Sequence, residues 1–452
     1  IFVRGQATLK NLWIKNNRAD GQFSLPGQSY SEHWGGGMYV YRNDGYVGNP
    51  IPVVEAGVYM ENVRITDNIA GGNGGGISFF QYSDSGGNYP VNNFVSKFKN
   101  VEISGNKSVR TDGNSTSGGG VHIVGRWNID FEDFEISNNE AVNNTAIYIY
   151  DNIGSTINFT RGKIDNNKEI LKQDWNHYAF LSTMYSPNST PNTINIESVV
   201  FSNNNTSRTT VAIGEGNLSI TNCTFVNNIG GQNQNVNFKD GNFLTLGNNT
   251  TVTIKNSIID YLNNSLPDVF AGSWATNYSV SAENTLFTKS IPTQITNLGN
   301  NLGNTDPLFI NKINGNYNLQ PNSPAIDVGN NSFLTLSPTL DAVSNNRIYN
   351  NTVDLGALEY QGTVSVNEQI KNTQFVLYPN PADSEVFLQF DEYQKGNVVI
   401  YDLQGKNVFS MNHIEVQKDK PLRINIDNLT SGIYMVRWTG NKFDTSVKLI
   451  KK

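Results

Sequence analysis

Acidic side chains that could bind a cation gather once in this sequence. Asp130, Glu132 and Glu135 alternate with the apolar residues Phe131 and Phe134, so we expect the three carboxylates to point outward from one extended segment. Carboxylate oxygens are the ligands that Ca²⁺ prefers in proteins, which makes the triplet a weak candidate for a Ca²⁺ site. A solvated acidic face is the simpler interpretation, and we predict no resident cofactor.

Residues arranged for catalysis are harder to find. Glycoside hydrolysis needs two carboxylates at a defined separation, and a lyase needs a base beside a neutralised uronate. Asn304-Thr305-Asp306 imitates part of a polygalacturonase motif, but neither Gly-His-Gly nor a paired Asp follows it. His122 is expected to point outward without other metal ligands nearby, and Cys223 is expected to lie in the core. We therefore predict that the protein is not an enzyme, with a polysaccharide lyase or glycoside hydrolase as the alternative.

Aromatic residues at regular intervals suggest a different chemistry. If the segments that carry them stack, their rings fall into two neighbouring outward columns. Ring faces pack against the C–H surfaces of sugars, and nearby amides bond sugar hydroxyls. Five residues form this candidate glycan-binding site: Tyr39, Tyr41, His122, Tyr148 and Tyr150. The alternative interpretation is that inserted loops, such as 44–53 or 168–187, cover the stripe.

A repeat must position these side chains. The pattern apolar-any-Asn-apolar-any-apolar-any-any-Asn starts at 9–17 and 60–68. It returns at 98–106, 131–139, 159–167, 196–204 and 220–228, without its last Asn at 254–262, and in part at 282–287. Apolar residues two apart share one face of a strand, whereas three apart require a corner between strands. Asn suits that corner because it tolerates the left-handed conformation.

The last Asn of each repeat recurs in register. Stacked coils would bring these side chains into one column of amides that bond from rung to rung. The residues of this structural ladder are Asn17, Asn68, Asn106, Asn139, Asn167, Asn204 and Asn228. Repeats of this length and composition are typical of solenoids. We predict an all-β fold, a right-handed parallel β-helix over residues 1–360.

The end of the predicted solenoid carries motifs of its own. Asp306-Pro-Leu-Phe309 is followed by Ser323-Pro-Ala-Ile-Asp-Val-Gly329, Asn346-Arg347 and Val353-Asp-Leu-Gly-Ala-Leu-Glu359. This order resembles the terminal segment of the choice-of-anchor Q family of bacterial surface β-helix proteins, with a departure at Leu358, where an aromatic residue is usual. The resemblance implies that residues 300–360 close the β-helix.

A different domain follows a polar linker at residues 361–373. From 374 to 452, short alternating strands separated by turn residues predict a small Ig-like β-sandwich. Its motif residues are Tyr378, Pro379, Asn380, Pro381, Asp402, Gly405, Lys406, Gly432, Tyr434, Lys448, Lys451 and Lys452. The pattern closely resembles the type A C-terminal sorting domain of type IX secretion substrates, which occur in Bacteroidota.

This second resemblance has consequences for location and partners. It implies export across the outer membrane, binding to the translocon and its shuttle barrel, and a secreted or cell-surface protein associated with the outer membrane. Such domains are usually removed after export. Because the chain still carries the domain, we hypothesise a molecule caught on its shuttle or retained there as an anchor.

Charge and composition exclude other classes of function. The 452 residues carry 32 Lys and Arg against 39 Asp and Glu, a net charge of −7, so no positive field would attract nucleic acid. No apolar run of about 18 residues predicts a transmembrane helix, and one Cys allows no internal disulfide. The chain begins at Ile1 in mid-pattern, as expected of a processed or truncated product.

Together these features favour a non-enzymatic surface module. We expect an adhesin that serves surface attachment or gliding motility, because a long solenoid face offers binding area. Surface glycans are the expected ligands. The alternative to binding and to catalysis is a scaffold within an outer-membrane secretion or gliding complex.

Overall fold

The chain divides into two units, Ile1–Gly362 and Thr363–Lys452. The computed structural model describes residues 1–19, 34–42, 55–81, 91–109, 116–150, 154–170, 181–184, 191–206, 209–229, 243–260, 268–271, 275, 277–335, 339–362, 375–390, 392–402, 405–418, 420–440 and 444–452.

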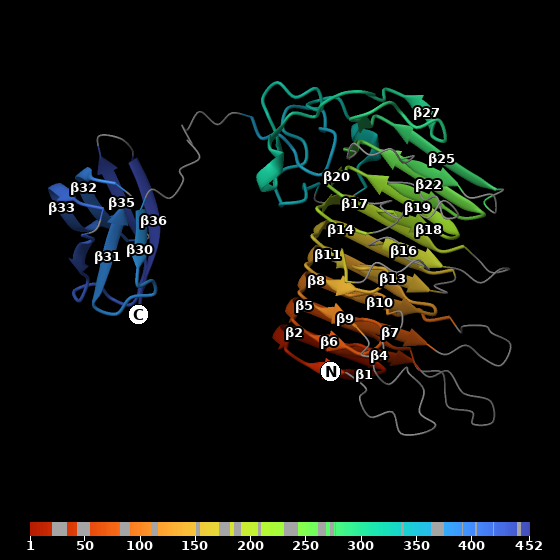
Figure 1. The fold of residues 1–452 in the computed structure, drawn as a ribbon, viewed down its shortest axis with the longest axis horizontal. Coiled ribbons are helices and arrows are strands. Elements are labelled where there is room, and N and C mark those ends of the chain that lie inside the picture. The colour runs from red at the N-terminus through yellow and green to blue at the C-terminus, as the bar shows by residue number, and fades with distance from the viewer. Residues whose placement is uncertain are drawn as a thin grey trace. The chain divides into compact units, whose positions relative to one another are not determined.

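Parallel strands wind the first unit into a solenoid (Figure 1). The 13-stranded sheet contains β2 (Gln6–Lys15), β5 (Gly57–Thr66), β8 (Val95–Ser104), β11 (Asn128–Ser137), β14 (Thr156–Asp165), β17 (Thr193–Ser202), β19 (Gly216–Thr221), β22 (Thr250–Lys255), β25 (Tyr278–Glu283), β27 (Thr296–Gly299), β20 (Thr224–Val226), β23 (Ile258–Ile259) and β26 (Leu286–Phe287). The 9-stranded sheet contains β1 (Phe2–Arg4), β4 (Met38–Arg42), β7 (Ile77–Gln81), β10 (Val121–Val124), β13 (Ile147–Tyr150), β16 (Leu181–Met184), β18 (Val211–Ile213), β21 (Leu244–Leu246) and β24 (Val269–Ala271).

A third sheet completes the cross-section. It contains β3 (Arg18–Ala19), β6 (Ile69–Ala70), β9 (Lys107–Ser108), β12 (Glu140–Ala141) and β15 (Lys168–Glu169). Along the N-terminal part of each sheet, hydrogen-bonded neighbours are three strands apart in sequence, so each coil contributes one strand to every sheet. This arrangement confirms the predicted parallel β-helix.

Inward-facing residues of successive coils stack on one another to form the core. Phe98, Phe131 and Phe159 form one such stack, with ring centroids 4.5 and 4.9 Å apart. All three side chains are buried. A parallel β-helix repeats the same inward position in every coil, so matching apolar residues fill a continuous core.

One corner of each coil is a single residue in the left-handed conformation. The corner residues are Asn11, Asn62, Asn100, Asp133, Arg161, Ser198, Asn222, Asn256 and Asn284. Asn and Asp adopt this conformation more readily than other L-residues. Arg161, with φ of 50°, is the bulkiest side chain at this position.

The amide ladder runs through the solenoid interior beside the third sheet. Asn139 Oδ1 accepts hydrogen bonds from the backbone N and the Nδ2 of Asn106, both at 3.0 Å. Asn139 Nδ2 donates to the carbonyl of Ile103 at 2.9 Å and to Asn167 Oδ1 at 3.0 Å. Side-chain amides join in the same way from Asn17 to Asn228.

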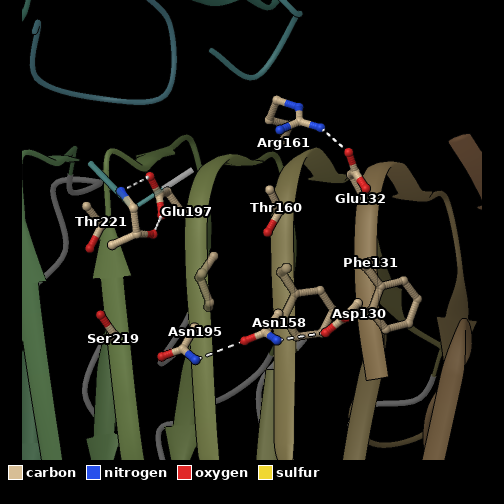
Figure 2. Close-up of a pocket in the computed structure, with 13 residues that line it drawn as sticks. Asp130, Phe131, Glu132, Asn158, Thr160, Arg161, Asn195, Glu197, Ser219 and Thr221 are labelled. Atoms are coloured by element: carbon tan, nitrogen blue, oxygen red, sulfur yellow. Dashed lines mark hydrogen bonds and ion pairs between the residues drawn. The ribbon is translucent and has the colours of Figure 1, made fainter. Parts of the chain in front are cut away.

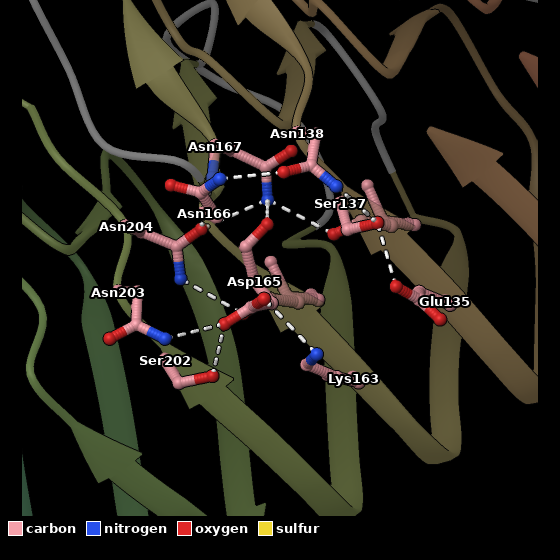
Figure 3. A network of polar contacts seen from close by, with 12 residues as sticks. Glu135, Ser137, Asn138, Lys163, Asp165, Asn166, Asn167, Ser202, Asn203 and Asn204 are labelled. Atoms are coloured by element: carbon pink, nitrogen blue, oxygen red, sulfur yellow. Dashed lines mark hydrogen bonds and ion pairs between the residues drawn. The ribbon is translucent and has the colours of Figure 1, made fainter. Parts of the chain in front are cut away.

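A more exposed polar network lies next to the ladder (Figure 3). Asp165 Oδ1 accepts from Ser202 Oγ at 2.6 Å and from Asn203 Nδ2 at 2.9 Å, and Lys163 Nζ lies 3.1 Å from Asp165 Oδ2. Asn166 Nδ2 donates to Asn138 Oδ1 at 2.6 Å. The amides therefore tie neighbouring coils together on both sides of this bend.

The last part of the first unit folds back over the corner residues. It contains β28 (Phe309–Asn311) and β29 (Asn316–Leu319), which pair antiparallel, and the short 3₁₀ helices η2 (Lys312–Asn314) and η3 (Asn331–Phe333). Asn256 Nδ2 donates to the carbonyl of Asn330, and Asn256 Oδ1 accepts from the backbone N of Asn330. Leu358 is buried in the apolar cluster of this segment.

The second unit consists of two antiparallel sheets. One contains β30 (Phe375–Tyr378), β31 (Glu385–Phe390) and β34 (Leu422–Asn425); the other contains β32 (Gln394–Tyr401), β33 (Asn407–Val416), β35 (Gly432–Gly440) and β36 (Asp444–Lys451). Trp438 is fully buried between the sheets, 4.7 Å from the ring of Phe390. The predicted all-β class with a small C-terminal sandwich is therefore confirmed.

Candidate functional site

Aromatic side chains form a strip on the 9-stranded sheet. The register pairs Tyr39 with Ser78, Ser78 with His122 and His122 with Tyr148. Tyr41 pairs with Phe80 in the next column. Ring centroids 4.8 to 6.3 Å apart connect the members of the aromatic strip, which are Phe2, Tyr39, Tyr41, Phe80, Trp34, His122, Tyr148 and Tyr150.

His122 is a buried member of this strip. Its side chain is 1% exposed, lies under Trp34 and Tyr148, and places Nδ1 3.0 Å from Ser78 Oγ. Burial lowers the pKa of His122 to about 3, so the ring is neutral at physiological pH. His122 faces outward from the core, as expected, but neighbouring rings cover it.

The tyrosines are more accessible. Tyr150 is 37% exposed, and Tyr39, Tyr41 and Tyr148 are half-buried. Residues 44–53 and 171–180, where covering loops are expected, lie outside the described residues. The strip therefore exposes ring surface at the tyrosines, and the buried His122 contacts both Trp34 and Tyr148.

A groove with a volume of about 520 Å³ lies on the 13-stranded sheet (Figure 2). Two rows of outward side chains cross β11, β14, β17 and β19 and form its floor. The first row is Asp130, Asn158, Asn195 and Ser219, and the second is Glu132, Thr160, Glu197 and Thr221. Thr335, from the segment that folds back over the corners, contributes the wall.

Hydrogen bonds and ion pairs organise the groove. Asn195 Nδ2 donates to Asn158 Oδ1 at 2.9 Å, and Asn158 Nδ2 donates to Asp130 Oδ1 at 2.7 Å. Glu197 accepts from both the backbone N and the hydroxyl of Thr335. Each carboxylate of the floor is thus already engaged on at least one side.

Arg161 forms the end of the groove and departs from the repeat. Its guanidinium contacts Glu132 at 2.5 Å and Asp133 at 2.7 Å, and its side chain is only 7% exposed. The next residue, Gly162, also departs from the apolar pattern, because a Cβ there would lie 2.5 Å from the ring of Phe134. An Arg at a corner position where the repeat usually has Asn is the signal in the sequence that marks this end of the groove.

The three candidate Ca²⁺ ligands do not converge. Asp130 and Glu132 line the groove, whereas Glu135 lies beyond the left-handed corner at Asp133. Glu135 instead accepts a hydrogen bond from Ser137 Oγ at 2.7 Å. No group of three Asp, Glu, His or Cys side chains suited to a metal is found among the described residues. The corner at Asp133 therefore separates Glu135 from the other two carboxylates.

Cys223 is buried in the inward column that also contains Val199. Burial raises the pKa of its thiol to about 12, and Sγ donates to the carbonyl of Thr221 at 3.2 Å. Only the thiolate is a good nucleophile. The residue therefore has the surroundings of a core side chain.

We predict that Cys223 in the native protein does not react with a thiol reagent at neutral pH. One equivalent should react once denaturant unfolds the solenoid, as measured by absorbance of the released leaving group. Cys223→Val, which restores the residue found at other positions of the column, should change the free energy of unfolding by less than about 1.5 kcal/mol. Rapid labelling of the folded protein would contradict the buried placement.

Charged residues of the terminal motifs are buried together. Arg347, Asp341, Asp354 and Glu359 are each at most 2% exposed. Desolvation raises the pKa of Asp354 to about 6 and that of Glu359 to about 8. Backbone N–H groups of Tyr349 and Asp354 donate to Glu359 at 3.1 and 3.0 Å. These residues hold the loops of the segment, a role that the sequence motif did not reveal.

The Asn304-Thr305-Asp306 triplet also has a local structural role. Asn304 is left-handed, with φ of 51°, and Asp306 Oδ1 accepts from the backbone N of Leu308 at 2.9 Å. Neither residue lines the groove. The resemblance to a polygalacturonase motif reflects a turn in this chain.

Motif residues of the second unit hold its last strand in place. Asn380 Oδ1 accepts from the backbone N of Ile450, and Asn380 Nδ2 donates to the carbonyl of Lys448. The backbone N of Ala382 donates to Ile450, and that of Lys452 donates to Ala382. The segment after β30 thereby covers the edge of β36, as sheet edges commonly require.

Other motif residues form turns or pair within the same unit. Asp402 Oδ1 accepts from the backbone N of Lys406, with Gly405 left-handed between them. Tyr434 Oη donates to the carbonyl of Thr430 at 2.8 Å. Gly432 pairs with Lys451 across β35 and β36.

Comparison with known families identifies this unit. Residues 376–452 match a family model described as the secretion system C-terminal sorting domain. The unit is a type IX secretion sorting domain. No curated protein matches the chain.

The sorting domain fixes the location of the protein. A chain that carries it is exported by the type IX system and is secreted or displayed on the cell surface, through interaction with the type IX machinery. Within the described residues, no helix has the length and apolar character needed to span a membrane.

Proposed function

We propose that the solenoid is a non-catalytic adhesin that binds surface or matrix glycans through the aromatic strip. The observation that carries this proposal is the unbroken series of ring contacts across five strands, with the exposed Tyr150 at one end. Export by the type IX system supports it, because it delivers the solenoid to the outside of the cell.

Ring geometry supports a sugar ligand. The centroids of Tyr148 and Tyr150 lie 6.2 Å apart, and those of Tyr39 and Tyr41 lie 5.9 Å apart. Successive residues of a glycan chain could therefore each meet a ring. Aromatic side chains lose little conformational entropy on binding because only two side-chain torsions are fixed. Surface attachment is the process that such a site serves.

We predict that Tyr148→Ala combined with Tyr150→Ala weakens glycan binding about tenfold or more, since each ring contact is worth roughly 0.5–1.5 kcal/mol. The full chain should be tested against neutral glucans, mannans, chitin fragments and polyuronates by retention and calorimetry. Tyr393→Ala is the control, because Tyr393 is 51% exposed but lies in the sorting domain. Unchanged affinity of the double variant for every retained glycan would refute the strip as the site.

The groove gives a specific reason to consider catalysis as well. Glu132 and Glu197 face it from strands separated only by β14, a separation of about 10 Å at the backbone. However, Arg161 binds Glu132, and Thr335 donates hydrogen bonds to Glu197. Chain length measured in the same assay decides: shortened glycan would establish a hydrolase or lyase.

A further inference from the structure

Uncharged polar residues fill two neighbouring outward columns of the 13-stranded sheet from β14 to β25. Every residue in these two columns is Thr, Asn or Ser, whereas the next outward column includes Glu197, Lys255 and Glu283. These ten residues, the polar array, are Thr156, Asn158, Thr193, Asn195, Asn217, Ser219, Thr251, Thr253, Ser279 and Ser281. The column of Asn158 continues with Asp130 in β11 and Lys97 in β8, so this column changes from charged to uncharged residues at β14.

The register gives the polar array a regular spacing. Neighbouring strands lie about 4.8 Å apart, and alternate residues of one strand lie about 6.7 Å apart. A sugar residue in an extended polysaccharide is comparable in length to the strand spacing. A chain that crosses the strands, along the solenoid axis, would therefore meet a new pair of hydroxyl or amide groups at nearly every sugar.

Hydrogen-bonding capacity matches that of a sugar. Hydroxyl and amide side chains both donate and accept, as do sugar hydroxyls. All ten residues of the array are half-buried or exposed. Asn158, Asn195 and Ser219 also form the floor of the groove, so part of the array is concave and can enclose a ligand, as carbohydrate and small-molecule sites usually do.

Charge selects among polysaccharides. Asp130, Glu132 and Glu197 line the groove, whereas Arg161 is the only cation among its described lining residues. The guanidinium of Arg161 is engaged by Glu132 and Asp133. Within the groove, a polyuronate would therefore meet net negative charge with the one cation already paired, whereas an uncharged chain would not be repelled.

We propose that the polar array is a second binding site, which takes an uncharged polysaccharide lying along the solenoid axis. The site is on a different sheet from the aromatic strip and shares no residue with it. Binding at the polar array does not require glycan binding at the aromatic strip.

Paired variants of the full chain test this inference. Asn158→Ala with Asn195→Ala removes two amides from the groove floor, and Thr193→Val with Thr253→Val removes two hydroxyls while keeping β-branched side chains. Asn314→Ala with Asn318→Ala is the matched control, since both Asn are exposed outside the array. Thermal unfolding of each variant verifies that it is folded.

The probes are a soluble neutral β-glucan and polygalacturonate of similar length. We expect the parent to retain the glucan with little dependence on salt and to leave polygalacturonate unretained. Each array variant should weaken glucan binding at least tenfold, and the control should bind as the parent does. Preference for polygalacturonate, or glucan binding unchanged in both array variants, would overturn the inference.

Comparison with the strip variant separates the two proposals. If Tyr148→Ala with Tyr150→Ala abolishes retention of the glucan while both array variants bind normally, the polar array is refuted and the strip stands. If the array variants lose the glucan and the strip variant binds every glycan as the parent does, the array stands and the strip is refuted. Shortening of the glucan would show that the protein cleaves it, and would refute the proposal that it only binds the polysaccharide.

Discussion

Replacing Asn139 by alanine is expected to lower the free energy of unfolding of the solenoid by about 4 kcal/mol, from roughly 1–3 kcal/mol for each buried polar group left without a partner. The variant removes the acceptor for both donors of Asn106 and the donor to Ile103. Water cannot replace these partners, because Asn139 and Asn106 are fully buried. Denaturant unfolding followed by circular dichroism measures the change.

The first rung of the ladder supplies the matched control. Asn17 has the same place in the repeat, but it is exposed and its side chain only donates, to Asn68 and Lys15. Asn17→Ala should cost less than about 1 kcal/mol, because water satisfies the groups that it leaves. Equal losses from the two variants would mean that the ladder follows the fold without stabilising it.

The second large effect is a loss of solenoid stability at alkaline pH. Burial raises the pKa of Glu359 from 4.5 to about 8 and that of Asp354 from 3.8 to about 6. Between the ordinary pKa of each group and its raised pKa, the folded protein holds a proton that the unfolded chain releases. The free energy of unfolding therefore falls as pH rises through that interval. For Glu359 the loss between about pH 5 and about pH 9 is on the order of 4 kcal/mol.

Glu359→Gln mimics the protonated side chain and should remove most of this pH dependence. Near pH 5 the variant should be slightly less stable than the parent, because an amide offers one acceptor oxygen where Tyr349 and Asp354 supply two donors. Near pH 9 it should be more stable. Calorimetry across this range measures both effects.

Glu61→Gln is the control for this experiment. Lys10 lowers the pKa of Glu61, so that group is already ionised in both states throughout the range. The Glu61→Gln variant should show the same change of unfolding free energy with pH as the parent. A parent whose solenoid is equally stable near pH 5 and near pH 9 would show that Glu359 is not protonated in the folded state.

Export determines where the solenoid acts. The sorting domain directs the chain out of the cell. The solenoid presents two sheets of different chemistry, an aromatic strip and a polar array, on one stack of coils. We infer that a long solenoid suits attachment because its repeated strands offer repeated ligand contacts.

The sequence alone determined the fold, the corners and the ladder, because these features repeat. An apolar residue two or three positions from the next dictates strand or corner locally, and Asn at the corner position is sufficient for the left-handed bend seen at Asn62 and Asn100. The sorting domain was equally visible, since its turn and strand residues follow one another within residues 374–452. Each of these predictions depends on neighbours in sequence or on one repeated register.

Tertiary structure decided which side chains are accessible and which meet. His122 faces away from the core, yet Trp34 and Tyr148 cover it, and Glu135 is separated from Glu132 by one left-handed residue. The burial of Glu359 depends on loops that return to the solenoid from far along the chain. Such contacts are set by packing between segments distant in sequence, and therefore no periodic pattern contains them.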